Sequence, residues 1–193
     1  MTNVSRETQD RLDRYKEMVI AENEHQNLIS LNSVLEFDLR HIADAAQLRT
    51  LRRPGSWCDI GSGAGIPGMV IAILGDDPVT LVEPRRLRAQ FLCRAAAELG
   101  IDVEVVQQKA EQFAGQFDNI TARAVADTSK LFAMTQHLAH RGTRWILPKG
   151  RSAKKELEAA QQSWQGSFTL VPSRTSDEAM ILVAEDVRRR GKR

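Results

Sequence analysis

The sequence predicts an α/β fold whose mostly parallel sheet ends in an antiparallel hairpin and is preceded by an N-terminal helical extension. From Ser56 onward, short β-rich runs alternate with helical stretches, an order that requires parallel strands joined by right-handed crossovers. The last two β-rich runs have only a loop between them, which favours antiparallel pairing. In the first fifty residues, apolar positions recur at helical spacing instead.

The composition is that of a globular protein of one domain. The chain has 193 residues, of which 42% are hydrophobic and 27% charged, and this length buries one sizeable core but is short for two. No apolar run reaches the length of a membrane span, and the first sixteen residues lack the apolar centre of a secretory signal. We therefore expect a cytoplasmic protein that does not associate with membranes.

Two helices are expected in the extension, which we assign to residues 1–50. The first is indicated by four apolar residues at helical spacing: Leu12, Tyr15, Met18 and Val19. A polar break follows. Ser33, with Glu36 three residues later, then has the pattern of a capping box at the start of a second helix.

The sheet domain is assigned to residues 51–187. Its five parallel strands are expected at 57–60, 79–82, 103–106, 120–122 and 145–147. The hairpin is expected from strands at 168–171 and 180–183. Residues 188–193 are rich in arginine and lysine and are assigned to a basic tail.

The cysteines indicate neither a disulfide framework nor a metal site. Only Cys58 and Cys93 are present, one on a predicted strand and one on a predicted helix, without metal-ligand spacing. Since free cysteine packs as a small hydrophobic residue, we expect both thiols to be buried.

Basic residues are clustered although the formal net charge is only +2. The clusters are Arg85, Arg86 and Arg88; Lys149, Arg151, Lys154 and Lys155; and Arg188, Arg189, Arg190, Lys192 and Arg193. Such clusters suit a polyanion, and a solvated face or a disordered tail is an equally open interpretation of each.

A glycine-rich turn connects the first predicted strand to a helix. Residues 57–68 read Trp-Cys-Asp-Ile-Gly-Ser-Gly-Ala-Gly-Ile-Pro-Gly. Glycines let the backbone turn sharply and approach a ligand, and the helix that follows offers unpaired N–H groups. The turn, with Gly61, Gly63 and Gly65, is therefore predicted to bind a cofactor. Gly63, Gly65 and Gly68 also match the G-x-G-x-x-G pattern, so a nicotinamide-dependent dehydrogenase remains an alternative.

Acidic residues at the strand ends favour S-adenosylmethionine as the cofactor. Asp59 precedes the first glycine by two residues, where a carboxylate can hold the amino group of a methionine moiety but would repel a pyrophosphate. Glu83 ends the second strand and is placed to accept both ribose hydroxyls, as in either cofactor class. Ala110 and Glu111 follow the third strand, where adenine is usually read. These features predict a Rossmann-like class I S-adenosylmethionine methyltransferase fold.

With these motifs the sequence resembles the bacterial small-subunit rRNA guanine-N7 methyltransferases, also called the glucose-inhibited division protein B family. The resemblance covers most of the chain. It is carried by Asn27-Leu28, Arg40-His41 with Asp44, residues 59–68, Phe91-Leu92, Ala110-Glu111, Arg123-Ala124-Val125 and Lys149-Gly150. The sequence departs from the family pattern at Pro84, where serine is frequent, and at Lys109, where arginine is more usual.

The resemblance implies methyl transfer to N7 of one guanosine in 16S rRNA. It also implies cofactor contacts by Gly61, Ile66, Ala110, Glu111 and Arg123. Because guanine N7 carries an unprotonated lone pair at neutral pH, we nominate no catalytic acid or base. The enzyme then contributes mostly orientation and exclusion of water.

Candidate RNA contacts are the basic residues expected at the mouth of the site: Arg40, His41, Arg123, Lys149 and Arg151. A surface charge or a helix cap is an equally open interpretation for each. The expected partner is 16S rRNA or the small ribosomal subunit, with no obligate protein partner. A catalytically silent RNA-binding protein is a second alternative, against which the complete cofactor motif argues.

Overall fold

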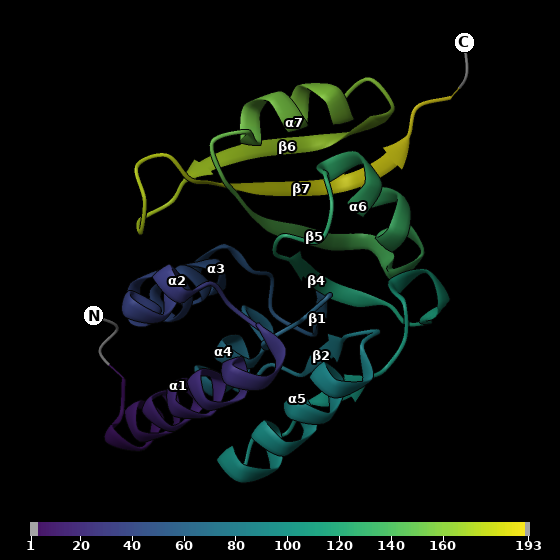
Figure 1. Ribbon diagram of the computed structural model, residues 1–193. Helices are drawn as coiled ribbons and strands as arrows, with labels where there is room; N and C mark the ends of the chain where they lie inside the picture. The colour runs from purple at the N-terminus through teal and green to yellow at the C-terminus, as the bar shows by residue number, and fades with distance from the viewer. Residues whose placement is uncertain (1–3, 192–193) are drawn as a thin grey trace.

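A computed structural model describes residues 4–191 of the chain. Within them, seven strands form one sheet in the order β3-β2-β1-β4-β5-β7-β6, parallel from β3 to β5 and antiparallel at β7 and β6. The strands are β1 (Trp57–Ile60), β2 (Val79–Val82), β3 (Glu104–Val106), β4 (Phe117–Ala122), β5 (Ala139–Lys149), β6 (Trp164–Pro172) and β7 (Met180–Arg189). The predicted fold is confirmed (Figure 1).

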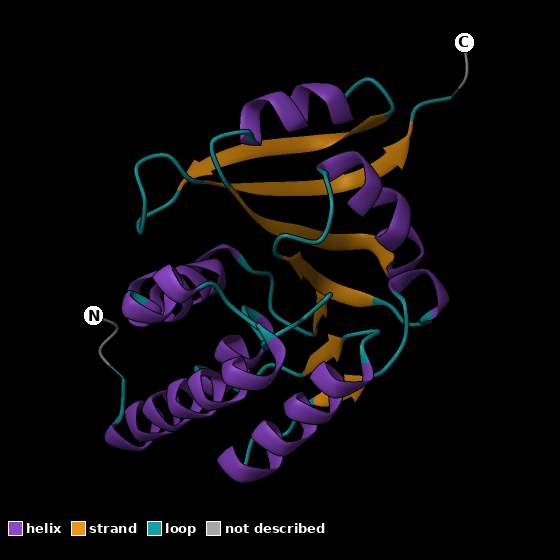
Figure 2. Cartoon of the chain, in the orientation of Figure 1, coloured by secondary structure: helices purple, strands orange, loops and turns teal. Residues whose placement is uncertain are grey.

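Helices cover both sides of this sheet (Figure 2). They are α1 (Arg6–Gln26), α2 (Leu31–Leu35), α3 (Asp44–Leu48), α4 (Gly68–Ile73), α5 (Arg86–Leu99), α6 (Thr128–Thr135) and α7 (Ala153–Ala160). Alternate residues of a strand point to opposite faces. Trp57 of β1 therefore packs in a core with α1, α3, α4 and α5, whereas Cys58 and Ile60 pack in a second core with α6 and α7. Burial on both faces explains why the parallel strands read as continuous apolar runs.

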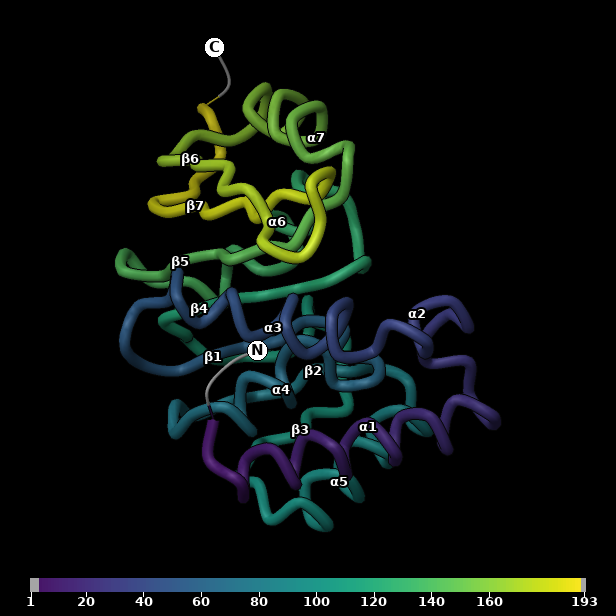
Figure 3. Tube along the Cα trace, turned by 90° about the vertical axis from the view of Figure 1, so that its left-hand side faces the viewer, coloured from purple at the N-terminus to yellow at the C-terminus, as the bar shows by residue number. Residues whose placement is uncertain are grey.

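The extension shares the first of these cores with the sheet. Helix α1 runs beside α5 (Figures 1 and 3). On the buried side of α1, the Tyr15 hydroxyl donates a hydrogen bond to the Ala64 carbonyl at 2.7 Å. At the exposed side, Arg94 of α5 pairs with Glu22 at 2.7 Å. Tyr15 therefore attaches the extension directly to the glycine-rich turn, and Glu22 attaches it to α5.

The second predicted helix of the extension is broken, and its predicted cap is wrong. The Ser30 side chain caps α2 by accepting a hydrogen bond from the Ser33 backbone N–H at 3.3 Å. The Ser33 hydroxyl instead donates back to the Ser30 carbonyl at 2.8 Å. After Glu36 the chain forms a π-helical turn, Asp38–Ala43, that leads into α3.

The basic segment that the sequence places after residue 187 begins inside β7. Arg188 pairs with Gln165 and Arg189 with Trp164 across the hairpin, and the Arg189 guanidinium lies 5.2 Å from the centre of the Trp164 ring. Pairing with β6 thus extends β7 two residues into the segment assigned to the tail. Lys192 and Arg193 lie outside the described residues.

The two cysteines differ in exposure. Cys58 is buried in β1, as predicted, but Cys93 is exposed. The expectation for Cys93 is wrong because α5 turns Leu92 and Ala95 toward the core and position 93 toward solvent.

Candidate cofactor and acceptor site

The predicted cofactor residues come from the carboxyl ends of the parallel strands. The glycine-rich turn follows β1, Glu83 follows β2, and Arg123 follows β4. Strands β2 and β4 lie on opposite sides of β1, so the chain order reverses at this point of the sheet. In open α/β sheets, ligands bind outside the carboxyl ends of the strands at such a reversal.

Glycine is required in the turn by its backbone conformation and by its neighbours. Gly61, Gly63 and Gly65 have φ angles of 66°, 58° and 93°, in the left-handed region that disfavours other residues. A side chain at Gly65 would also lie 2.9 Å from the Tyr15 hydroxyl oxygen. The sequence assigns Tyr15 only to an apolar stripe. Its hydroxyl supports the turn, a role that depends on a contact 49 positions along the chain.

Asp59 has a buried carboxylate of which only one oxygen is bonded. The residue is 1% exposed, and its Oδ2 accepts a hydrogen bond from the Gly68 backbone N–H at 3.0 Å. Among the described residues, Oδ1 has no hydrogen-bond partner. Burial raises the pKa of this carboxyl group to about 7. A buried, incompletely bonded carboxylate beside the turn suits a cationic amino group, which would supply both the hydrogen bond and the charge.

Glu83 supports the same turn from β2. It is 3% exposed; its Oε2 accepts from the Gly63 N–H at 2.8 Å, and its Oε1 accepts from the Arg85 N–H at 2.9 Å. An ionised carboxylate has about four acceptor positions. Glu83 can therefore accept two ribose hydroxyls without losing these backbone contacts.

The residues predicted to lie near the adenine differ in their surroundings. Ala110 is buried at the start of a short 3₁₀ turn, Ala110–Gln112, and Glu111 beside it is exposed. Ile66 is buried, with its side chain in the core shared with α4. A contact from Ile66 to a cofactor would thus come from its backbone.

Arg123 is held by the extension. Its Nη1 donates to the Arg40 carbonyl at 3.2 Å and lies 2.9 Å from His41 Nδ1. His41 is 4% exposed, and burial together with the Arg123 charge lowers its pKa to about 4. The imidazole is therefore neutral at pH 7 and accepts the Arg123 hydrogen bond.

His41 is thus not placed as the sequence suggests for an RNA contact, whereas the Arg40 side chain is exposed. His41 is buried against Phe37, with ring centres 4.9 Å apart, and behind Arg123. The Arg40 side chain forms an ion pair with Glu36. The two residues position the Arg123 guanidinium, an arrangement that only the packing of the extension on the sheet reveals.

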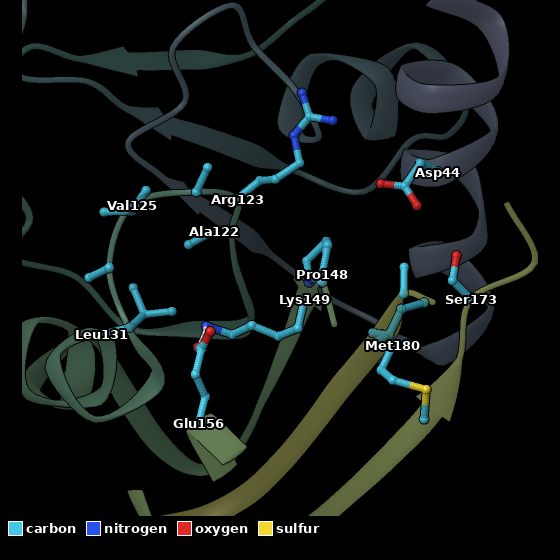
Figure 4. A pocket seen from close by; sticks show the side chains of 15 residues that line it. Asp44, Ala122, Arg123, Val125, Leu131, Pro148, Lys149, Glu156, Ser173 and Met180 are labelled. Carbon is cyan, nitrogen blue, oxygen red and sulfur yellow. Dashed lines mark hydrogen bonds and ion pairs between the residues drawn. The ribbon is translucent and has the colours of Figure 1, made fainter. Parts of the chain in front are cut away.

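A cavity of about 310 Å³ lies between the carboxyl ends of β4 and β5 (Figure 4). It is lined by Asp44, Ala122, Arg123, Ala124, Val125, Ala126, Leu131, Pro148, Lys149, Gly150, Glu156, Ser173, Ala179, Met180 and Ile181. We call it the acceptor pocket. Lys149 lines it and pairs with Glu156 at 2.9 Å, whereas Arg151 lies outside it and contacts Glu178 at 2.6 Å.

A single loop separates the acceptor pocket from the turn. Ala124 has a φ of 56°, and Val125 next to it lies so close to the turn that a side chain at Gly61 would lie 2.6 Å from Val125 Cγ2. The pocket and the turn are therefore neighbours, as a methyl donor and its acceptor require.

Residues 4–191 offer neither a metal site nor a membrane-spanning helix. In that part of the chain no group of three or more histidine, cysteine, aspartate or glutamate side chains could hold a metal ion. None of its helices is long and apolar enough to cross a membrane.

Solved structures with the same fold include methyltransferases. The ribosomal protein L11 methylase of Lactobacillus delbrueckii subsp. bulgaricus matches with a TM-score of 0.59 and 20% identity, covering 76% of this chain and 77% of the methylase. The glycopeptide N-methyltransferase MtfA, solved with S-adenosyl-L-methionine, matches with a TM-score of 0.60 and 12% identity, covering 75% of this chain and 86% of its own. At this identity, the likeness establishes the class I methyltransferase fold.

The family is established by sequence. The model of the GidB family, rRNA small subunit methyltransferase G, matches residues 8–177. The ribosomal RNA small subunit methyltransferase G of Zymomonas mobilis is 43% identical, covering 95% of this chain and 88% of its own length. That of Rhizorhabdus wittichii is 44% identical, covering 98% and 90%. The nicotinamide alternative is therefore wrong, and the chain belongs to the rRNA small subunit methyltransferase G family of S-adenosylmethionine-dependent rRNA methyltransferases.

Proposed function

We propose that this enzyme methylates N7 of one guanosine in 16S rRNA, in the cytoplasm, acting on the free rRNA or on the small ribosomal subunit. The observation that carries the proposal is the acceptor pocket beside Arg123, which adjoins the glycine-rich turn and has room for a base. The names of the relatives, which specify small-subunit rRNA, support the choice of substrate.

The residues around the turn fit S-adenosylmethionine, which supplies an electrophilic methyl group when bound. Asp59 would hold the amino group of the methionine moiety and Glu83 the ribose hydroxyls, while Ala110 and Glu111 would adjoin the adenine. Arg123, fixed by His41, would lie at the boundary between the cofactor and the acceptor. In these assignments the protein binds and orients the cofactor.

The nucleophile in this reaction is an atom of the substrate itself. Guanine N7 attacks with a lone pair that carries no proton, so no residue of the pocket must remove one. N7 lies on the major-groove edge, which a double-stranded RNA helix buries in a deep and narrow groove. The target guanine would therefore be unpaired, or would be splayed out of its stack into the pocket.

The function is tested by mapping N7-methylguanosine in rRNA from cells with and without the gene. We expect one N7-methylguanosine in 16S rRNA that disappears with the gene and returns with a plasmid copy. An Arg123→Ala copy serves as the control for catalysis. Unchanged methylation in the deleted strain would contradict the proposal, as would RNA binding by the purified protein without methyl transfer.

Exposed basic residues near the site are the candidates for phosphate contacts. Arg85 and Arg86 are exposed at the start of α5, next to Glu83. Unlike Arg94, which pairs with Glu22, neither forms an ion pair within residues 4–191. Lys154 and Lys155 are similarly exposed on α7, close to the acceptor pocket.

Combined replacement of Arg85 and Arg86 by glutamine is expected to flatten the salt dependence of 16S rRNA binding. Each neutralised phosphate contributes about 0.7 to 0.9 to the slope of log affinity against log salt concentration, so the slope should fall by about 1 to 2. Filter binding over a salt series measures it. Arg141→Gln is the matched control, because Arg141 is exposed near the start of β5, whereas the candidate site lies at the carboxyl ends of the parallel strands. Equal slopes for the two variants would leave Arg85 and Arg86 without a role in RNA binding.

A further inference from the structure

Asp44 lines the acceptor pocket although it belongs to the extension. Its Oδ1 accepts hydrogen bonds from Gln47 Nε2 at 2.8 Å and from the Thr175 hydroxyl at 2.9 Å. Gln47 is itself buried and bonded to the loop between β6 and β7, donating to the Ser173 hydroxyl at 3.0 Å and accepting from the Arg174 N–H at 2.9 Å. This network holds one carboxylate oxygen in place between two distant parts of the chain.

The second oxygen of Asp44 is available to a ligand. Within residues 4–191 no side chain or N–H group donates to Oδ2, and no cation forms an ion pair with Asp44. Figure 4 shows Asp44 across the pocket from Val125 and Leu131, with one carboxylate oxygen turned toward the pocket.

Glu156, on another wall of the same pocket, provides the contrast. Its Oε2 accepts from Lys149 at 2.9 Å and from the Thr128 hydroxyl at 3.3 Å, and its Oε1 accepts from the Ser152 hydroxyl at 2.6 Å. Its charge is balanced by a lysine and most of its acceptor positions are used. Asp44 is instead held by neutral donors. Burial lowers the pKa of Arg123 and the charge of Asp44 raises it, but the two side chains form no ion pair within residues 4–191, and Oδ2 keeps its acceptor positions for whatever enters the pocket.

The chemistry of purines indicates what would use that oxygen. A guanine whose N7 faces the methyl donor presents its N1–H and 2-amino group on a different edge, and both are donors. An adenine presents an unprotonated N1 on that edge, whose lone pair a carboxylate repels. The free carboxylate oxygen of Asp44 therefore favours guanine in two ways: it accepts hydrogen bonds from guanine and repels N1 of adenine.

We propose that Asp44 is a specificity-determining residue: its Oδ2 accepts hydrogen bonds from the N1–H and 2-amino group of the acceptor guanine. The inference rests on the proposed function and adds to it the group that recognises the base. It also gives the extension a part in recognition, because Asp44 and Gln47 lie on α3 and their partners lie after β6.

The test uses 16S rRNA with guanosine or inosine at the mapped target position, assembled by ligation. Inosine keeps N1–H, O6 and N7 but lacks the 2-amino group. For the wild-type enzyme, we expect the substitution to lower kcat/KM by about ten- to a hundredfold, the effect of one hydrogen bond to a charged group. In Asp44→Ala the same substitution should change kcat/KM by less than about threefold, because the partner of the amino group is gone.

The ratio of kcat/KM for the guanosine RNA to that for the inosine RNA is independent of the folded fraction of the enzyme. A loss of stability in Asp44→Ala would therefore not imitate the result. Asp44→Asn, which is nearly isosteric, should also reduce the ratio. Asp38→Ala is the matched control from the same extension, since Asp38 is exposed and pairs with Lys16 at 2.8 Å; it should keep the wild-type ratio. Equal ratios in wild type and Asp44→Ala would overturn the inference alone. Absence of methyl transfer by the wild type to the guanosine RNA would overturn the proposed function and the inference with it.

Discussion

Asp59→Asn is expected to weaken S-adenosylmethionine binding by about 1 to 3 kcal/mol, the scale of a lost charged hydrogen bond. The buried Oδ1 of Asp59 has no partner among the described residues, and a cationic amino group would complete its bonding. Asparagine preserves the size of the side chain and can still accept from Gly68 N–H. The loss of affinity would therefore report the charge of the carboxylate.

The same substitution should stabilise the protein without its cofactor at alkaline pH. Burial raises the folded-state pKa of Asp59 from 3.8 to about 7, so the folded protein keeps a proton that the unfolded chain has released. The free energy of unfolding consequently falls as pH rises from the unfolded-state pKa to the folded-state pKa of Asp59. Above pH 7 the folded protein bears the full cost of burying the ionised carboxylate. Asp59→Asn removes that cost. We expect a higher Tm than the wild type at pH 8, by about 2 to 4 °C per kcal/mol, and a difference that disappears toward pH 4.

Isothermal calorimetry at pH 6 and pH 8 measures the binding side of this prediction. Since a cationic amino group favours ionised Asp59, the wild type should bind more weakly at pH 6, and Asp59→Asn should lose that pH dependence. Glu83→Gln is the comparison at the other end of the cofactor; we expect it to weaken binding by a similar 1 to 3 kcal/mol. Unchanged affinity in either folded variant would rule out its assigned contact.

Arg123→Ala is expected to lower methyl transfer by about a hundredfold or more, the scale observed when a group that orients or stabilises charge is removed from an active site. Arg123 lines the acceptor pocket, and its guanidinium is held by His41 Nδ1 and the Arg40 carbonyl. That support holds the charge at the wall of the acceptor pocket only as long as the extension is packed in place. Thermal stability should change far less than the rate.

A structural role for Arg123 is the competing interpretation. Within residues 4–191 Arg123 forms no ion pair, although the charge of Asp44 opposes the lowering of its pKa by burial. Single-turnover rates and thermal melting of Arg123→Ala and of Arg123→Lys distinguish the two roles. If the Tm collapses while the remaining folded protein turns over normally, the structural interpretation is correct.

The pattern of apolar and turn residues was enough to predict those strands whose bounds are set by neighbouring residues in the sequence. The bounds of β1 and β2 agree with the prediction because each strand is a short apolar run between turn residues. Elements of the C-terminal hairpin were predicted too short, since the second half of β7 consists mostly of charged residues and is extended by its pairing with β6. Cys93 and Ser33 were misplaced because their surroundings depend on the phase of a helix and on the exact residue that begins it.

The sequence by itself determined the fold class, the glycine-rich turn, the acids that flank it and the family. The turn is encoded within a few consecutive residues, where backbone geometry leaves little choice. The fold class and the family follow from the order of short runs and motifs along the chain, each of which is itself local. Tertiary structure decided the rest: that Tyr15 supports the turn, that His41 lies behind Arg123, and that Asp44 faces the acceptor pocket. These three residues belong to an extension whose position is set by burial of its apolar side against the sheet. Such packing brings together groups separated by many positions, and no local pattern records their distance.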